Sequence, residues 1–281
     1  MIKPLEIQKL RKVYPTFTLD NISFSLEPGK ITGFIGRNGA GKSTTLNALF
    51  NFVNPDAGRV LFWGEDVNTK ECEIKQKVGF VSSGVNYYPT KKLKKITTIT
   101  KMFYHNWDED AYNRYMHLFK LDENKTPKQL SVGMKIKYAL VLALSHKAEL
   151  LILDEPTSGL DPVSREELLD IFINLSEEGK TILFSTHITS DLEKCADQIV
   201  YIKNGQIKAD KSIKVFVEEY KLVSFDKEEM SEVQKDLLIG AKKAKTGMTA
   251  LVSSKRMNEL SKSWAVSEAT LDDIMIHMEV E

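Results

Sequence analysis

Cysteine is scarce in this chain, with two residues in 281, Cys72 and Cys195, which form no CxxC pattern. A disulfide scaffold and a cysteine-based zinc site are therefore both disfavoured, and the composition suits a reducing compartment. Excess charge of one sign is also missing, because 39 basic residues balance 39 acidic ones. A globally basic nucleic-acid binder is thereby disfavoured, and we expect no nucleic-acid partner.

Long apolar runs are absent as well. The most apolar stretch, Tyr138 to Leu144, is much shorter than the roughly 18–20 residues that cross a bilayer. The first residues, Met1 to Glu6, lack the apolar region of a secretory signal. We therefore expect a soluble, cytoplasmic chain whose membrane association comes through a partner. Its ordinary apolar and charged content fits one large globular domain with a small appendage.

The pattern of apolar residues predicts a mixed α/β body. From Ile2 to Leu26, apolar and polar positions alternate, which predicts β-structure exposed on one side. Buried strands, typical of a parallel sheet covered on both faces, are predicted at Ile31–Ile35, Leu150–Leu153 and Thr181–Ser185. The remaining predicted elements are the helices Ser43–Phe52 and Ser164–Glu177, the strand Arg59–Trp63, and a hairpin of Ile199–Ile202 and Gln206–Ala209 around Asn204-Gly205.

Changes in composition divide the chain into three parts. Between about residues 85 and 146 lysines and aromatics are frequent and strand alternation fades, so we expect a mainly helical subdomain inserted in the main domain, 1–212. In residues 213–281 lysine and glutamate alternate with scattered apolar positions, which favours a small α/β appendage. Its predicted elements are strands at Tyr220–Phe225 and Met248–Ser253 and a helix at Ala269–Glu279, starting near Ser267 or Thr270.

A glycine-rich loop lies between a predicted strand and a predicted helix. Its sequence, Gly36-Arg-Asn-Gly-Ala-Gly-Lys-Ser43, matches the phosphate-loop pattern G-x-x-x-x-G-K-[ST] in full. The glycines let backbone N–H groups approach phosphate oxygens, Lys42 supplies positive charge, and the Ser43 hydroxyl suits Mg²⁺. The loop predicts a nucleoside triphosphate site and does not separate a GTPase, a kinase and an ATPase. The expected contact residues are Gly36, Arg37, Asn38, Gly39, Ala40, Gly41, Lys42, Ser43 and Thr44, with Arg37 and Asn38 acting mainly as backbone donors.

Two acids, Asp154 and Glu155, directly follow the apolar strand Leu150–Leu153. In a parallel sheet ligands sit at the carboxyl ends of the strands, so both acids are expected beside the phosphate loop. Asp154 would face the Mg²⁺ held by Ser43, and Glu155 would act as the general base that polarises the attacking water. The structural alternative is a polar strand end with two solvated acids.

Three further segments resemble motifs of the ATP-binding cassette (ABC) ATPases. Leu130–Met134 resembles their LSGGQ signature, Ser158–Asp161 their D-loop, and His187 their switch histidine. The order of all five motifs matches that family over about residues 1–210. The resemblance implies an α/β fold: a P-loop NTPase of the ABC ATPase type, with an antiparallel β subdomain, an inserted helical subdomain and a small C-terminal α/β extension.

The resemblance also implies a mechanism in which two subunits clamp two ATP molecules head to tail, as a homodimer or with a sister ATPase. Ser131 and the Gly133 backbone would contact the γ-phosphate across the dimer. His187 would hydrogen-bond the γ-phosphate and hold Glu155 and water in place. Asp161 would communicate between the two sites. Tyr14 stands where family members stack an aromatic ring on adenine.

The sequence departs from the family pattern at two places. Val132 and Met134 replace the glycine and glutamine of the usual signature. Ser83 aligns with a glutamine that normally touches Mg²⁺ and the attacking water. A serine hydroxyl spans that distance only with a bridging water, so we expect Ser83 to be a weak metal contact.

The amino-acid sequence around the motifs resembles that of ATPases of bacterial drug, antibiotic and peptide exporters. Among these it resembles the staphylococcal exporters of phenol-soluble modulins, which are amphipathic peptides. One cassette with no membrane span implies separately encoded transmembrane permease subunits and a place on the inner face of the cell membrane. Residues 85–101 either border the groove that receives these permeases or form a solvated face. The appendage either regulates the ATPase or stabilises its dimer, or it is a passive cap.

The alternative function is a soluble ABC ATPase acting on ribosomes or DNA. Such proteins carry two cassettes, long coiled coils or zinc motifs, and this sequence shows none of these.

Overall fold

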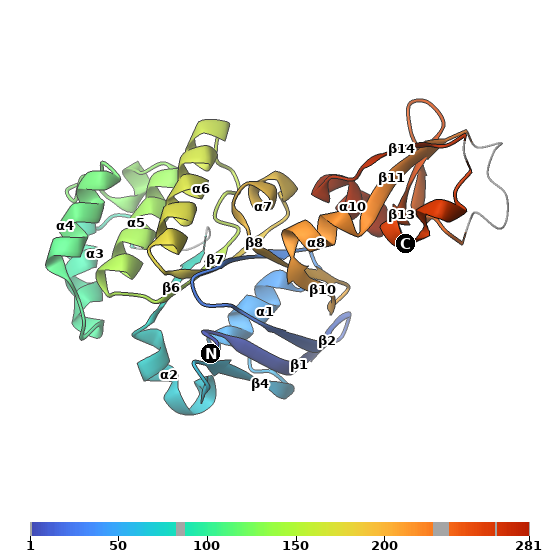
Figure 1. Ribbon diagram of the computed structural model, residues 1–281. Helices are drawn as coiled ribbons and strands as arrows, with labels where there is room; N and C mark the ends of the chain where they lie inside the picture. The colour runs from blue at the N-terminus through green and yellow to red at the C-terminus, as the bar shows by residue number, and fades with distance from the viewer. Residues whose placement is uncertain (1, 83–87, 227–235, 262, 281) are drawn as a thin grey trace. The chain divides into compact units, whose positions relative to one another are not determined.

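The computed structural model describes residues 2–82, 88–226, 236–261 and 263–280. The chain divides into two compact units, residues 1–210 and 211–281 (Figure 1). Within the described ranges, no helix combines the length and the apolar character that crossing a bilayer requires.

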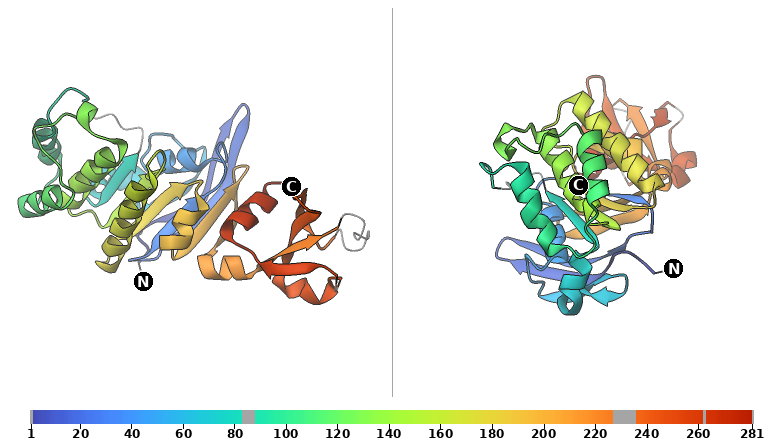
Figure 2. Two further views of the ribbon diagram at one scale, coloured as in Figure 1. Left: turned by 90° about the horizontal axis from the view of Figure 1, so that it is seen from above. Right: turned by 90° about the vertical axis from the view of Figure 1, so that its left-hand side faces the viewer.

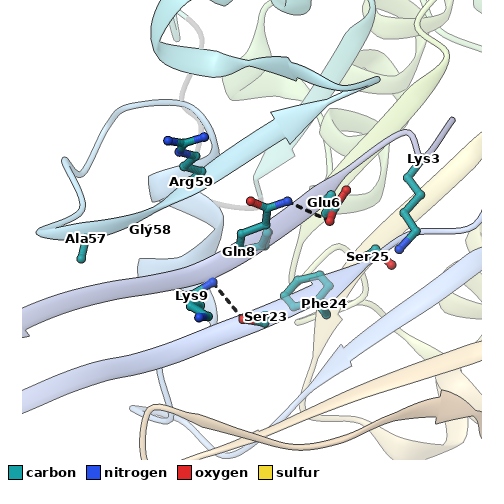
Figure 3. Close-up of a pocket in the computed structure, with 11 residues that line it drawn as sticks. Lys3, Glu6, Gln8, Lys9, Ser23, Phe24, Ser25, Ala57, Gly58 and Arg59 are labelled. Atoms are coloured by element: carbon teal, nitrogen blue, oxygen red, sulfur yellow. Dashed lines mark hydrogen bonds between the residues drawn. The ribbon is translucent and has the colours of Figure 1, made fainter.

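An antiparallel sheet forms one layer of the first unit, with strand order β2-β1-β4-β5. Alternation along the first two strands turns Ile7, Leu19 and Phe24 into the core and leaves polar residues on the other face. That polar face carries an open hollow of about 730 Å³, in which Gln8 donates to Glu6 and the Lys9 backbone donates to Ser23 (Figure 3). The strands are β1 Glu6–Tyr14, β2 Phe17–Ser25, β4 Ala57–Phe62 and β5 Glu65–Asp66.

A six-stranded sheet, ordered β10-β9-β3-β8-β7-β6, forms the centre of the same unit. The strands from β9 to β6 in that order run parallel, and β3 and β8 are buried along their whole length. Asn204 and Gly205 both have positive φ and make the tight turn between β9 and β10, as their pairing predicts. The strands are β3 Ile31–Ile35, β6 Val78–Ser82, β7 Leu150–Asp154, β8 Thr181–Thr186, β9 Gln198–Lys203 and β10 Gln206–Ser212.

Helices complete the first unit. Those between β6 and β7 gather on one side of it (Figures 1 and 2). The predicted helix Ser43–Phe52 is shorter than expected, because Asn51 adopts a positive φ of 57° and the chain turns there. The helices are α1 Lys42–Leu49, α2 Val67–Lys75, α3 Leu93–Thr100, α4 Glu109–Leu118, α5 Val132–Ser145, α6 Pro162–Glu177 and α7 Thr189–Cys195, with short 3₁₀ turns η1 Lys101–Phe103 and η2 Pro127–Gln129.

The second unit is an antiparallel sheet, ordered β12-β13-β11-β14, with its own small core. In that core the Trp264 ring stacks on Phe225 with centroids 4.4 Å apart. Thr270 caps the last helix and exchanges hydrogen bonds with Asp273, so the helix begins at Leu271, two residues after the predicted start at Ala269. The elements are α8 Ile213–Glu218, β11 Tyr220–Phe225, β12 Ile239–Lys243, β13 Met248–Ser253, η4 Ser254–Glu259, β14 Ala265–Glu268 and α10 Leu271–Met278.

Candidate active site

The phosphate loop connects β3 to α1, and its backbone conformation requires glycine. Gly41, the N-cap of α1, has a φ of 113°, which side chains rarely tolerate. A Cβ at Gly41 would also lie 2.5 Å from Leu19 Cδ2 and 2.9 Å from Phe17 Cζ. The Gly205 N–H donates to the Ala40 carbonyl at 3.0 Å, so the β9–β10 turn supports the loop. The loop therefore approaches the start of α1 with its backbone exposed to a ligand.

Lys42 is the buried cation of this loop. Its residue is 5% exposed, and its Nζ donates to the Gly36 carbonyl at 2.6 Å. The same Nζ lies 3.4 Å from Glu155 Oε1. A buried ammonium needs such partners, because desolvation strongly disfavours an unpaired charge. Lys42 thus links the phosphate loop directly to the acid pair.

The acid pair stands at the carboxyl end of β7, between two serines on the neighbouring strands. Register places Asp154 beside Ser82 of β6 and Ser185 of β8. Ser185 Oγ donates to Asp154 Oδ1 at 2.6 Å and accepts the Glu155 N–H at 3.0 Å. Glu155 has a φ of 50°, a left-handed conformation that costs a non-glycine residue about 1–2 kcal/mol. The sharp turn takes the Glu155 side chain out of the strand direction.

His187, just after β8, contacts the Glu155 carboxylate. Its Nδ1 lies 2.8 Å from Glu155 Oε2, and its side chain is 44% exposed. Because a carboxylate accepts, Nδ1 carries the proton in this contact, which leaves Nε2 for another partner. Glu155 is therefore held from two sides, by His187 and by Lys42.

A cavity of about 710 Å³ joins these groups. That volume falls within the usual range for small-molecule sites. The described residues that line it are Thr16, Phe17, Arg37, Asn38, Gly39, Gly41, Lys42, Ser43, Thr44, Glu155, Ser158 and His187. The phosphate loop, the general-base candidate and the histidine thus meet in one place, as their order in the chain predicts. Gly36 and Ala40 are buried within the phosphate loop. Asp154, the residue before Glu155, accepts a hydrogen bond from Ser185.

Three predicted contact residues, Ser131, Gly133 and Asp161, form a separate group outside the described lining of this cavity. Ser131 caps α5, accepting from the Met134 N–H, and Asp161 caps α6, accepting from the backbone N–H groups of the second and third helical residues. Hydrogen bonds donated by Ser164 hold the pKa of Asp161 below its usual value. A Cβ on Gly133 would lie 3.5 Å from Leu160 Cδ2, so the two helix starts adjoin.

The sequence motifs do not predict Thr16, Phe17 or Ser185 as site residues, and they include Ser158 only as the first residue of the D-loop. A serine in the interior of a fully buried strand is the signal that points to Ser185, because a buried hydroxyl needs partners.

Tyr14, expected to stack on adenine, is outside the described lining and 37% exposed. It pairs across the hairpin with Phe17, which does line the cavity. Ser83, the expected weak metal contact, lies outside the described residues.

A second brace holds the chain just after Glu155. Thr157 Oγ1 donates to Asp191 Oδ2 of α7 at 2.6 Å, and both residues are buried. Burial raises the pKa of Asp191. The segment that carries Glu155 and the segment that carries His187 are consequently tied together both by the contact between these two side chains and by the Thr157–Asp191 hydrogen bond.

Comparison with known proteins identifies the family of this chain. Residues 19–158 match the ABC transporter family. The linearmycin resistance ATP-binding protein LnrL of Bacillus subtilis is 34% identical over 212 residues, 73% of this chain and 68% of the relative. The lantibiotic transport ATP-binding protein SrtF of Streptococcus pyogenes is also 34% identical, over 74% of this chain and 90% of that protein. A solved ATP-binding subunit of an ABC transporter is 28% identical with a TM-score of 0.68, covering 75% of this chain and 90% of its own. The chain belongs to the ATP-binding proteins of ABC transporters and is an ATPase.

Proposed function

We propose that this ATPase is the motor subunit of an exporter and that Glu155 and His187 carry out its hydrolytic step. The observation that carries the proposal is the 2.8 Å contact between the two side chains, beside Lys42 and within the phosphate-loop cavity. Glu155 accepts a proton from the water that attacks the γ-phosphate. His187 holds the carboxylate through Nδ1, and as an imidazolium it also donates from Nε2 to a phosphate oxygen. When ATP enters, Lys42 gives up its contact with Glu155 and binds the phosphates instead.

The donor set at this site fits Mg²⁺. Ser43, at the start of α1, offers a hydroxyl oxygen, and Asp154, at the end of β7, offers a carboxylate oxygen that Ser185 does not use. Hard oxygen donors of this kind are what Mg²⁺ takes from proteins, with water and phosphate oxygens completing the octahedron. When bound, Mg²⁺ would neutralise charge on the β- and γ-phosphates.

We further propose that the catalytic unit is a head-to-tail pair, either of two copies of this chain or of this chain with a sister ATPase. The chain carries two separate groups of predicted ATP contacts: the cavity, and the adjoining starts of α5 and α6. Ser131, Gly133 and Asp161 belong to the second group. Two chains facing each other bring the second group of one to the cavity of the other, which places the N-terminus of α5 against the γ-phosphate.

The proposed partners in the membrane are separately encoded permease subunits, which the ATPase meets at the inner face of the cell membrane. One exposed aromatic ring supports such docking: Phe52 is 62% exposed, and its ring centroid lies 5.9 Å from that of buried Phe50 and 6.1 Å from that of partly buried Phe80. The relatives LnrL and SrtF are a linearmycin resistance protein and a lantibiotic transport protein, which favours an antibiotic or amphipathic peptide as cargo. The narrower likeness to exporters of phenol-soluble modulins stays a prediction.

The experiment that tests the proposal is Glu155→Gln, which keeps the shape of the side chain and removes its basicity. We expect ATP hydrolysis to fall about 10²- to 10⁴-fold, while ATP still binds and the ATP-bound dimer accumulates. Turnover is measured by phosphate release, and the dimer by light scattering with ATP. The matched control is Glu149→Gln, at the other end of the same strand, where the carboxylate lies 3.5 Å from Lys77 Nζ on the surface. Normal turnover in Glu155→Gln would refute the general-base assignment.

A further inference from the structure

We propose that Ser185 is a positioning residue of the ATPase, which fixes the metal-facing carboxylate and the general base with one hydroxyl group. The inference rests on the proposed roles of Asp154 and Glu155. Ser185 is fully buried, two residues before His187, and its Oγ contacts Asp154 Oδ1 and the Glu155 N–H at the same time. A single buried oxygen therefore connects the proposed metal ligand, Asp154, with the backbone of the proposed general base, Glu155.

The hydroxyl orients Asp154 by occupying one of its two oxygens. The Ser185 Oγ–Asp154 Oδ1 distance of 2.6 Å is typical of a charge-assisted hydrogen bond. The terminal torsion of an aspartate is otherwise broad, so the carboxylate rotates easily without a fixed partner. With Oδ1 held by Ser185, Oδ2 stays available for Mg²⁺ or for a water bound to it.

The same oxygen supports the left-handed turn at Glu155. The Glu155 N–H is directed both to Ser185 Oγ, at 3.0 Å, and to the Ser185 carbonyl oxygen, at 3.1 Å. Removing the hydroxyl therefore leaves the N–H with the backbone acceptor, and no buried donor becomes unpaired. The fold should consequently tolerate Ser185→Ala, and the main loss falls on the orientation of Asp154 and Glu155.

The test measures the affinity for a fluorescent ATP analogue with Mg²⁺ and with EDTA, together with the kcat and KM of hydrolysis. In Ser185→Ala we expect the gain in affinity due to Mg²⁺ to shrink about tenfold, because Asp154 loses a charge-assisted hydrogen bond that fixes its carboxylate. Affinity in EDTA should stay unchanged, and kcat should fall more than KM changes. Ser185→Thr keeps the hydroxyl and should restore the Mg²⁺ gain.

Two further variants control the experiment. Ser145→Ala removes another fully buried serine hydroxyl, which donates to the Val141 carbonyl inside α5, and should leave the Mg²⁺ gain intact. Ser185→Cys is nearly isosteric and only a weak donor, so it should fold even if the alanine variant does not, and it should show a reduced gain. Asp154→Asn tests the underlying metal assignment and should lose the gain in an otherwise native chain.

The outcomes are distinct. A full Mg²⁺ gain in both the Ser185→Ala and Ser185→Cys proteins, with Asp154→Asn impaired, would overturn the role of Ser185 and leave the metal assignment standing. An equal loss in Ser145→Ala would show a general effect of core hydroxyls and would also overturn it. A full gain in Asp154→Asn would refute the proposed metal ligand, and the inference with it.

Discussion

Two histidines in two regions of the first unit make the same kind of contact with opposite consequences. His187, at the phosphate-loop cavity, is 44% exposed and donates from Nδ1 to a carboxylate. His146, where the helical segment returns to the parallel sheet, is 3% exposed and donates from Nδ1 to the Gln76 carbonyl at 3.1 Å. The first ring lies beside a charge in an open cavity, whereas the second is closed to solvent. Burial and partner, and not residue type, separate a histidine suited to catalysis from one suited to packing.

The surroundings of His146 show what that closed region does. The Tyr104 ring stacks on His146 with centroids 3.9 Å apart, and burial lowers the pKa of His146 to about 4. The Gln76 side chain donates to the Phe103 carbonyl at 2.8 Å and accepts from the His105 N–H at 3.0 Å. These bonds fasten the helical segment to the chain entering β6. A neutral, buried ring is suited to this structural role.

The largest expected difference between the two regions is in turnover. His187→Ala removes the Nδ1 contact with Glu155 and the donor to the phosphate, so we expect kcat to fall about 10²- to 10³-fold with little change in thermal stability. Phosphate release and a melting curve measure the two quantities. Exposed His105→Ala serves as a control, because within the described part of the chain His105 forms a hydrogen bond only through its backbone N–H. A folded His146 variant with the same loss of kcat would break the comparison.

The sequence predicted which charged groups lie together at the phosphate loop better than it predicted the residues that support them. Lys42, Asp154 and Glu155 are found from sequence because phosphate chemistry demands those residue types at those spacings. Ser185 is harder to find, since its importance depends on strand register that places it beside Asp154. In the appendage, β12 and β14 were not predicted, because lysines fill the end of β12 and every residue of β14 is exposed. Short edge strands lack the apolar alternation that identifies a half-buried strand.

A smaller effect, on stability, is expected at His146 as the pH falls. The unfolded chain takes up the proton near pH 6.5, whereas the folded chain resists it until about pH 4. His146 therefore makes its full contribution to the free energy of unfolding above pH 6.5. This contribution is lost as the pH falls toward 4, and the total loss is about 3 kcal/mol. Urea unfolding of the wild type at pH 7 and pH 4.5 measures the decline.

His146→Phe keeps a ring against Tyr104 and removes the titrating group, so it isolates the contribution of His146. Its urea midpoint should fall less between pH 7 and pH 4.5 than that of the wild type. Buried Asp191, with its raised pKa, acts in the opposite direction, and it contributes equally to both proteins. If the urea midpoints of the two proteins fall equally between pH 7 and pH 4.5, His146 is not a neutral buried ring, and its difference from His187 is not established.

The smallest expected effect concerns the rim of the cavity, where Tyr14 and Phe17 face each other across the β1–β2 hairpin. Phe17 packs against the phosphate loop, while Tyr14 is 37% exposed with Lys12 Nζ 5.8 Å from its ring centroid. We expect Tyr14 to offer its free ring face to adenine, so Tyr14→Ala should weaken ATP binding about fivefold to tenfold. Affinity for inorganic triphosphate should stay the same, because that ligand has no base. If Phe17→Ala alone causes a base-dependent loss, the stacking ring is Phe17, and the aromatic contact lies within the cavity lining rather than at its rim.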